Sequence, residues 1–222
     1  MSSRDIMLAT IRHAIGRAVP DGLPPVPPPA APPPYRRRLE ATGPEIVDRF
    51  LERLRDYNVH VEVLDSEAAV IPAATARLAA LGIDRLVIPA DLPAAWRPAG
   101  VALVEDQALD HQALDAIPGA LTGAALAIAE TGSIVLDGGR HQGRRALTLL
   151  PDYHLCVVFA DQLVGLVPEA MDQLGRHPAR PITFFSGPSA TADIELDRVV
   201  GVHGPRTLDV LFVTGPTQPR EF

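Results

Sequence analysis

The chain has 222 residues, of which 47% are hydrophobic, and this is enough for one sizeable globular core without an exotic stabiliser. The formal net charge is -7, and all 20 basic residues are arginine. A broad nucleic-acid surface needs clustered cations to neutralise phosphates, so the composition argues against a nucleic-acid-binding protein.

Cys156 is the only cysteine. It excludes an internal disulfide, an iron–sulfur cluster and any zinc site built from several thiolates of this chain, so we expect no cofactor or metal in the chain itself. The first residues are charged rather than apolar, and no apolar run approaches the ~20 residues that cross a bilayer. We therefore expect a soluble cytoplasmic protein without a membrane span.

The N-terminal region divides into a short helix and a proline-rich segment. An apolar stripe through Arg4 to Arg17 predicts an amphipathic helix that ends before Pro20. Nine of the 23 prolines lie between Pro20 and Pro34, which removes amide donors and predicts a linker or arm, with a proline-rich recognition motif as the alternative. We expect residues 1–40 to form this arm and residues 41–222 to form the domain.

Beyond residue 40, helical and strand patterns alternate. Helices are predicted at Pro44 to Tyr57, Glu67 to Leu81 and Val167 to Leu174. Short apolar or alternating runs predict strands at Val59 to Leu64, Arg85 to Pro89, Val101 to Val104, Ser133 to Leu136, Leu155 to Phe159, Ile182 to Phe185 and Leu208 to Val213. This order favours an α/β fold with a mostly parallel sheet flanked by helices.

Three polar clusters lie where predicted strands begin or end, which is where open α/β folds bind ligands. The first comprises Glu130, Thr131, Gly132 and Ser133. Gly132 suits a tight connection that turns Glu130 and Thr131 toward a cleft. A helix end with a glycine cap is the alternative.

The second cluster surrounds a predicted strand. Arg145, or its neighbour Arg144, offers a guanidinium fork for a carboxylate or phosphate, although a solvated arginine is the simpler interpretation. His154 precedes an apolar run, so it is either a proton donor at the mouth of a strand or a structural histidine. Cys156, within that run, is expected to be buried packing.

The third cluster follows a strand and is rich in glycine and small hydroxyl residues, which can surround a small anionic or polar group. It matches no phosphate-loop, dinucleotide or zincin motif. In an extended segment Asp193 and Glu195 share a face, where they can hold Arg206 or His203 instead of a ligand. Its candidate ligand-binding residues are Ser186, Gly187, Ser189, Thr191, Asp193, His203 and Arg206.

The chain resembles the lactate-utilisation protein C family, with its LUD domain. The matching segments are AIAETGSIVLD at Ala127 to Asp137, RRALTLLPDYHLCVV at Arg144 to Val158, and SGPSATADIELDRVVGVHGPR at Ser186 to Arg206. They stand in the expected order over the C-terminal half. The N-terminal half matches only in its helix and strand character, and the Pro-rich arm is not part of the pattern.

The resemblance implies a fold similar to the sugar-isomerase and CoA-transferase group and a role in oxidising L-lactate to pyruvate. It also implies two partner subunits that carry iron–sulfur clusters, and Cys156 alone suits the cluster-free member. The family has no firmly assigned mechanism, so no catalytic role is transferred. The alternative function is a stand-alone enzyme or sensor that binds a sugar phosphate, an acyl-CoA or a small carboxylate through the same loops.

Overall fold

The computed structural model describes residues 3–14, 16, 34–192, 198–200 and 204–215, and it divides into two units, Met1–Tyr35 and Arg36–Phe222. In the first unit, α1 (Ser3–Ala14) confirms the predicted helix but ends at Ala14. Its Ile6, Met7 and Ile11 side chains are at least half exposed. The domain boundary that the sequence places at residue 40 stays a prediction.

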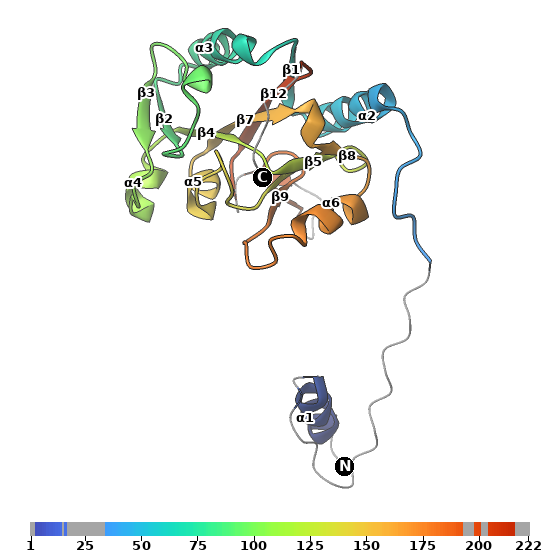
Figure 1. Ribbon diagram of the computed structural model, residues 1–222. Coiled ribbons are helices and arrows are strands. Elements are labelled where there is room, and N and C mark those ends of the chain that lie inside the picture. The colour runs from blue at the N-terminus through green and yellow to red at the C-terminus, as the bar shows by residue number, and fades with distance from the viewer. Residues whose placement is uncertain (1–2, 15, 17–33, 193–197, 201–203, 216–222) are drawn as a thin grey trace. The chain divides into compact units, whose positions relative to one another are not determined.

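The second unit holds the remaining elements (Figure 1). Its helices are α2 (Gly43–Asp56), α3 (Val70–Leu81), α4 (His111–Asp115), α5 (Arg145–Leu149) and α6 (Val167–Leu174), with 3-10 turns η1 (Glu67–Ala69), η2 (Ala94–Trp96) and η3 (Ala160–Gln162). Its strands are β1 (His60–Leu64), β2 (Arg85–Ile88), β3 (Ala102–Glu105), β4 (Gly119–Gly123), β5 (Leu126–Ile128), β6 (Ser133–Leu136), β7 (Tyr153–Phe159), β8 (Leu163–Val164), β9 (Thr183–Phe185), β10 (Ala190–Ala192), β11 (Arg198–Val200) and β12 (Thr207–Val213).

Six strands form a parallel sheet in the order β1-β12-β7-β4-β2-β3, which confirms the predicted α/β class. Helical crossovers separate the strands of such a sheet, and the alternating helix and strand patterns reflect this. Two predicted strands, β6 and β9, belong instead to a second sheet, β8-β5-β6-β9, in which β6 pairs antiparallel with both neighbours. The turn from β5 to β6 spans only a few residues, and so short a connection allows only antiparallel pairing.

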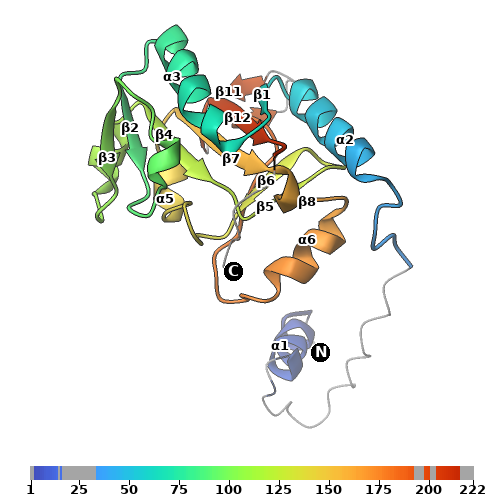
Figure 2. The ribbon, with the colours of Figure 1, turned by 45° about the horizontal axis from the view of Figure 1, so that its top comes forward.

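The large sheet is covered on both faces. On one face, Leu155, Val157 and Phe159 of β7 join a core cluster with α3. On the other, Cys156 and Val158 pack with α2 and with the inward face of the small sheet. The outer face of the small sheet packs against Ala170 and Leu174 of α6, and Figure 2 shows this small sheet between the large sheet and α6.

A buried ion pair joins α3 to the large sheet. The Asp209 carboxylate on β12 is 1% exposed and accepts hydrogen bonds from Arg77 Nε at 2.7 Å and from the Tyr153 hydroxyl at 2.9 Å. The pKa of Tyr153 is raised by burial and by the neighbouring Asp209 charge. These three side chains therefore tie a helix and two central strands together.

The segment that enters the domain is held by acidic side chains. Arg36 pairs with Glu130 at 3.0 Å, and Arg37 pairs with Asp172 at 2.9 Å. The backbone N–H of Leu39 donates to Glu169 at 2.8 Å. Residues 36–39 are thus attached to α6 and to the turn between β5 and β6.

Candidate functional site

The first polar cluster forms the turn between β5 and β6, so the alternative of a capped helix end is wrong here. Gly132 has φ +60°, a conformation that glycine adopts without steric cost. A Cβ atom at this position would lie 2.6 Å from Arg53 Cβ and 3.1 Å from the Arg53 carbonyl carbon, so the turn packs directly on α2. Glycine is required here both by the backbone conformation and by the close approach of a helix.

A chain of hydroxyl groups connects the first cluster to the third. Thr131 Oγ1 lies 2.7 Å from Ser133 Oγ, and Ser133 Oγ lies 2.6 Å from Ser186 Oγ. Ser133 is buried, whereas Ser186 is exposed. Two segments separated by about fifty residues are therefore brought together, and their hydroxyls bond mainly to each other.

The third cluster continues along the same side of α2. Gly187 has φ +89°, and a Cβ atom there would lie 2.8 Å from Tyr57 Cβ. The Ser189 N–H donates to the Pro205 carbonyl at 2.8 Å. Thr191 lies on β10, which pairs antiparallel with β11. Asp193 and His203 lie outside the described residues.

Glu130 is bound by cations of its own chain. Its carboxylate pairs with Arg49 at 2.7 Å and with Arg36 at 3.0 Å. The hydrogen bond from Arg49 is the largest of the effects that hold the pKa of Glu130 below its usual value. In this arrangement Glu130 anchors the entering segment and α2.

His154 is deeply buried. It is the second residue of β7, is 1% exposed, and shares a 2.8 Å hydrogen bond between its Nε2 and Thr122 Oγ1. Its Nδ1 has no partner among the described residues. Burial lowers the pKa of His154 to about 4, so the ring is neutral near pH 7. The position suits a structural histidine better than a proton donor at the mouth of a strand.

We expect the free energy of unfolding to fall by about 3 kcal/mol between pH 7 and pH 4 because of His154 alone. Each unit by which the folded pKa lies below the unfolded pKa corresponds to about 1.4 kcal/mol. The unfolded histidine takes a proton near its ordinary pKa of about 6.5, whereas the folded one resists until about pH 4. The contribution of the neutral ring to stability is therefore complete above the unfolded pKa and is lost as the pH falls from there toward the folded pKa. Urea titrations at several pH values measure this slope.

Matched substitutions isolate the effect of His154. His154→Gln keeps a polar partner for Thr122 but does not titrate, so its stability should change less between pH 7 and pH 4 than that of the native protein. His177→Gln removes an exposed histidine and should leave the native slope intact. Parallel curves for the native protein and His154→Gln would show that the buried ring does not control acid stability.

The arginines of the second and third clusters have different surroundings. Arg144 makes a two-pronged ion pair with Asp106, at 2.7 and 3.0 Å. Arg206 pairs with Asp152 at 3.3 Å in an exposed position. Arg145, the first residue of α5, is exposed and has no ion pair with any residue that the structure describes.

Arg145 lines a hollow of about 370 Å³. Three segments form its walls: the end of β6 with the loop after it, the first turns of α5, and the segment that leads into β9. The lining residues are Leu136, Asp137, Gly138, Gly143, Arg144, Arg145, Thr148, Ala179, Arg180, Pro181 and Thr183.

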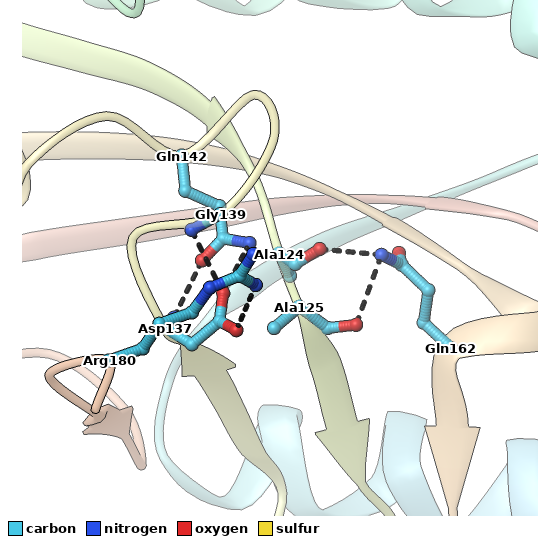
Figure 3. A network of polar contacts seen from close by, with 7 residues as sticks. All are labelled: Ala124, Ala125, Asp137, Gly139, Gln142, Gln162 and Arg180. Atoms are coloured by element: carbon cyan, nitrogen blue, oxygen red, sulfur yellow. Dashed lines mark hydrogen bonds and ion pairs between the residues drawn. The ribbon is translucent and has the colours of Figure 1, made fainter. Parts of the chain in front are cut away.

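A polar network fixes one wall of this hollow (Figure 3). Asp137 accepts hydrogen bonds from the Gly139 N–H at 2.9 Å, from Gln142 Nε2 at 3.1 Å and from Arg180 Nη1 at 2.8 Å. Sequence reasoning did not select Asp137 or Arg180. The signal for Asp137 was an acidic residue directly after an apolar strand and before two glycines, whereas nothing in the sequence paired it with Arg180.

Comparison with known proteins identifies the family to which the chain belongs. The family model for the LUD domain matches residues 45–213. The chain belongs to the LUD domain family. This confirms the resemblance carried by three segments of the C-terminal half and extends it to α2, which the sequence motifs did not reach.

Relatives of this LUD domain chain align over most of its length. Lactate utilization protein C of Deinococcus radiodurans is 45% identical over 214 residues, which cover 93% of each chain. The uncharacterized protein YkgG of Escherichia coli K12 is 30% identical over 92% of this chain and 95% of its own. A crystal structure of a DUF162 family protein from Deinococcus radiodurans, 38% identical, has a TM-score of 0.68 and covers 78% of this chain and 99% of that one.

Within the described part of the LUD domain chain, no cluster of three or more His, Cys, Asp or Glu side chains is arranged to hold a metal ion. The helices described there include none that is both long enough and apolar enough to cross a membrane.

Proposed function

We propose that the chain is a cluster-free subunit of a system that oxidises L-lactate to pyruvate. The observation that carries the proposal is the alignment with a protein named Lactate utilization protein C, at 45% identity over 93% of both chains. Other proteins with that name, from Geobacillus kaustophilus among them, match at lower identity. An alignment over nearly the whole of both chains supports a shared role more strongly than a shared fold does.

The chemistry of the chain supports a division of labour with partner subunits. Oxidation of lactate releases two electrons, which need an acceptor. The single cysteine of this chain cannot ligate a cluster, and Cys156 is buried in β7, where burial raises the pKa of its thiol to about 12. In the proposed system, iron–sulfur partner subunits carry the electrons, and this chain binds a small anionic metabolite or a partner.

Growth on lactate tests the role. Deleting the gene in the source organism should abolish growth on L-lactate as sole carbon source and leave growth on glucose unchanged, and the native gene supplied on a plasmid should restore it. Normal growth of the deletion strain on lactate would refute the proposal.

Co-purification tests the partners. An affinity-tagged chain from lactate-grown cells should retain proteins with the visible absorbance of iron–sulfur clusters, whereas the tag alone should not. Recovery of the chain without such proteins, from cells in which it restores lactate growth, would remove the partners from the proposal and keep the role.

A further inference from the structure

We infer that the hollow lined by Arg145 and Arg180 is a binding site for a small monocarboxylate. The choice of this ligand class rests in part on the proposed function, because lactate and pyruvate are both monocarboxylates.

One wall of the hollow is a loop that reaches the edge at which parallel sheets bind ligands. The loop between β6 and α5 meets the carboxyl ends of three strands: the His141 N–H donates to Asp91 after β2, Arg144 pairs with Asp106 after β3, and the Gly123 N–H at the end of β4 donates to the His141 carbonyl. Ligands of open α/β sheets bind at this edge. A volume of about 370 Å³ falls within the range of roughly 300–1,000 Å³ found for small-molecule sites.

One arginine of the hollow is held in place. Asp137 is 7% exposed, and burial, the largest single effect, raises its pKa. Hydrogen bonds from Arg180, Gly139 and Gln142 outweigh that effect, so the pKa of Asp137 is lowered and the carboxylate stays ionised. It binds Arg180 through Nη1, and the other guanidinium nitrogens of Arg180 donate to no residue in the described part of the chain. Asp137 thus orients Arg180 and leaves its remaining guanidinium N–H groups available to a ligand.

The charges around the hollow leave one positive charge uncompensated. Asp137 neutralises Arg180, and Asp106 neutralises Arg144. Arg145 has no ion pair among the described residues, so the lining favours a ligand with a single negative charge. A phosphate monoester carries a charge of about -1.5 to -2 at pH 7 and would be matched less well.

A polar side chain lies on the same wall as Arg145. The buried Thr148 hydroxyl donates to the Arg145 carbonyl at 3.2 Å, which leaves its oxygen as an acceptor. A ligand that places its carboxylate between the two guanidinium groups and a hydroxyl toward Thr148 would use all three. Lactate carries both groups, and pyruvate carries the carboxylate alone.

Titration calorimetry on the full chain tests the site with L-lactate, pyruvate, acetate and inorganic phosphate as probes. We expect a monocarboxylate to bind the native protein and Arg145→Gln to weaken its binding by about 10–100-fold, as expected for a lost charge-assisted hydrogen bond. Arg176→Gln, an exposed arginine that does not line the hollow, should bind like the native protein. Arg180→Gln should also lose affinity, and its thermal midpoint reports any damage to the Asp137 network.

Three results would overturn the inference: no monocarboxylate binding at millimolar concentration, equal losses of affinity in Arg145→Gln and Arg176→Gln, or tighter binding of inorganic phosphate than of any monocarboxylate. The growth experiment keeps this test separate from the proposed function. If the chain restores growth on lactate but binds no monocarboxylate, the proposed site is refuted and the proposed role is kept. A chain that binds lactate while its deletion strain grows normally on lactate removes the role and keeps the site.

Discussion

Replacing Arg77 by methionine is expected to lower the free energy of unfolding by about 3 kcal/mol or more. Methionine keeps much of the apolar stem of the side chain, but it leaves the Asp209 carboxylate, which is 1% exposed, with the Tyr153 hydroxyl as its one side-chain partner among the residues that the structure describes. Removing one partner of a buried ion pair is costly because the remaining charge stays desolvated. Urea denaturation at pH 7, read at constant slope, measures the loss.

An exposed Arg–Asp pair provides the control. Arg206 and Asp152 approach to 3.3 Å with side chains that are 59% and 68% exposed, so Arg206→Met should cost less than about 1 kcal/mol. The contrast between the two variants tests whether burial sets the cost. Similar losses for both would show that the Asp209 pair is not the structural centre that its geometry indicates.

Replacing Gly132 by alanine is expected to destabilise the protein by about 3 kcal/mol, from a steric clash and from backbone strain together. The new Cβ atom would lie 2.6 Å from Arg53 Cβ and 3.1 Å from a backbone carbon of α2. Neither of these atoms is the end of a flexible side chain, so a change of rotamer cannot relieve the clash. The positive φ adds the cost of a left-handed conformation for a residue with a side chain. Chemical denaturation measures the sum.

Gly82→Ala separates the two costs. Gly82 ends α3 with φ +68°, but nothing lies within 4 Å of the position that a Cβ atom would take. This variant should lose only about 1 kcal/mol, the cost of the conformation alone. If Gly132→Ala lost no more than Gly82→Ala, the turn between β5 and β6 would have room to move away from α2.

The sequence predicted most of the large sheet because its strands are apolar and are separated by helical patterns. It missed β4, whose GALTG sequence has one β-branched residue, Thr122, and no aromatic residue, which is too few to mark a strand. The structure explains the small residue at its start: a Cβ atom at Gly119 would lie 2.8 Å from both Leu86 and Tyr153. Packing between neighbouring strands, which no local pattern encodes, selected glycine there.

The candidate site was predicted less completely than the fold. Hydroxyl-rich motifs pointed to Ser133 and Ser186, which do lie together, and the guanidinium fork pointed to Arg145, which lines the hollow. The partners of Glu130 depend on how the entering segment and α2 lie, and the pairing of Asp137 with Arg180 spans 43 residues and two strands. Contacts between residues so far apart in the chain produce no pattern of spacing from which they could be predicted.

The position of Cys156 makes its thiol a natural reporter of the opening of the central sheet. The only thiol of the chain sits in the middle of β7, fully enclosed, with Sγ directed to the Gly123 carbonyl at 3.6 Å. An alkylating reagent can reach this sulfur only when the central strands part. The rate of alkylation, followed by mass spectrometry on the native chain without an engineered cysteine, therefore measures how often the sheet itself comes apart.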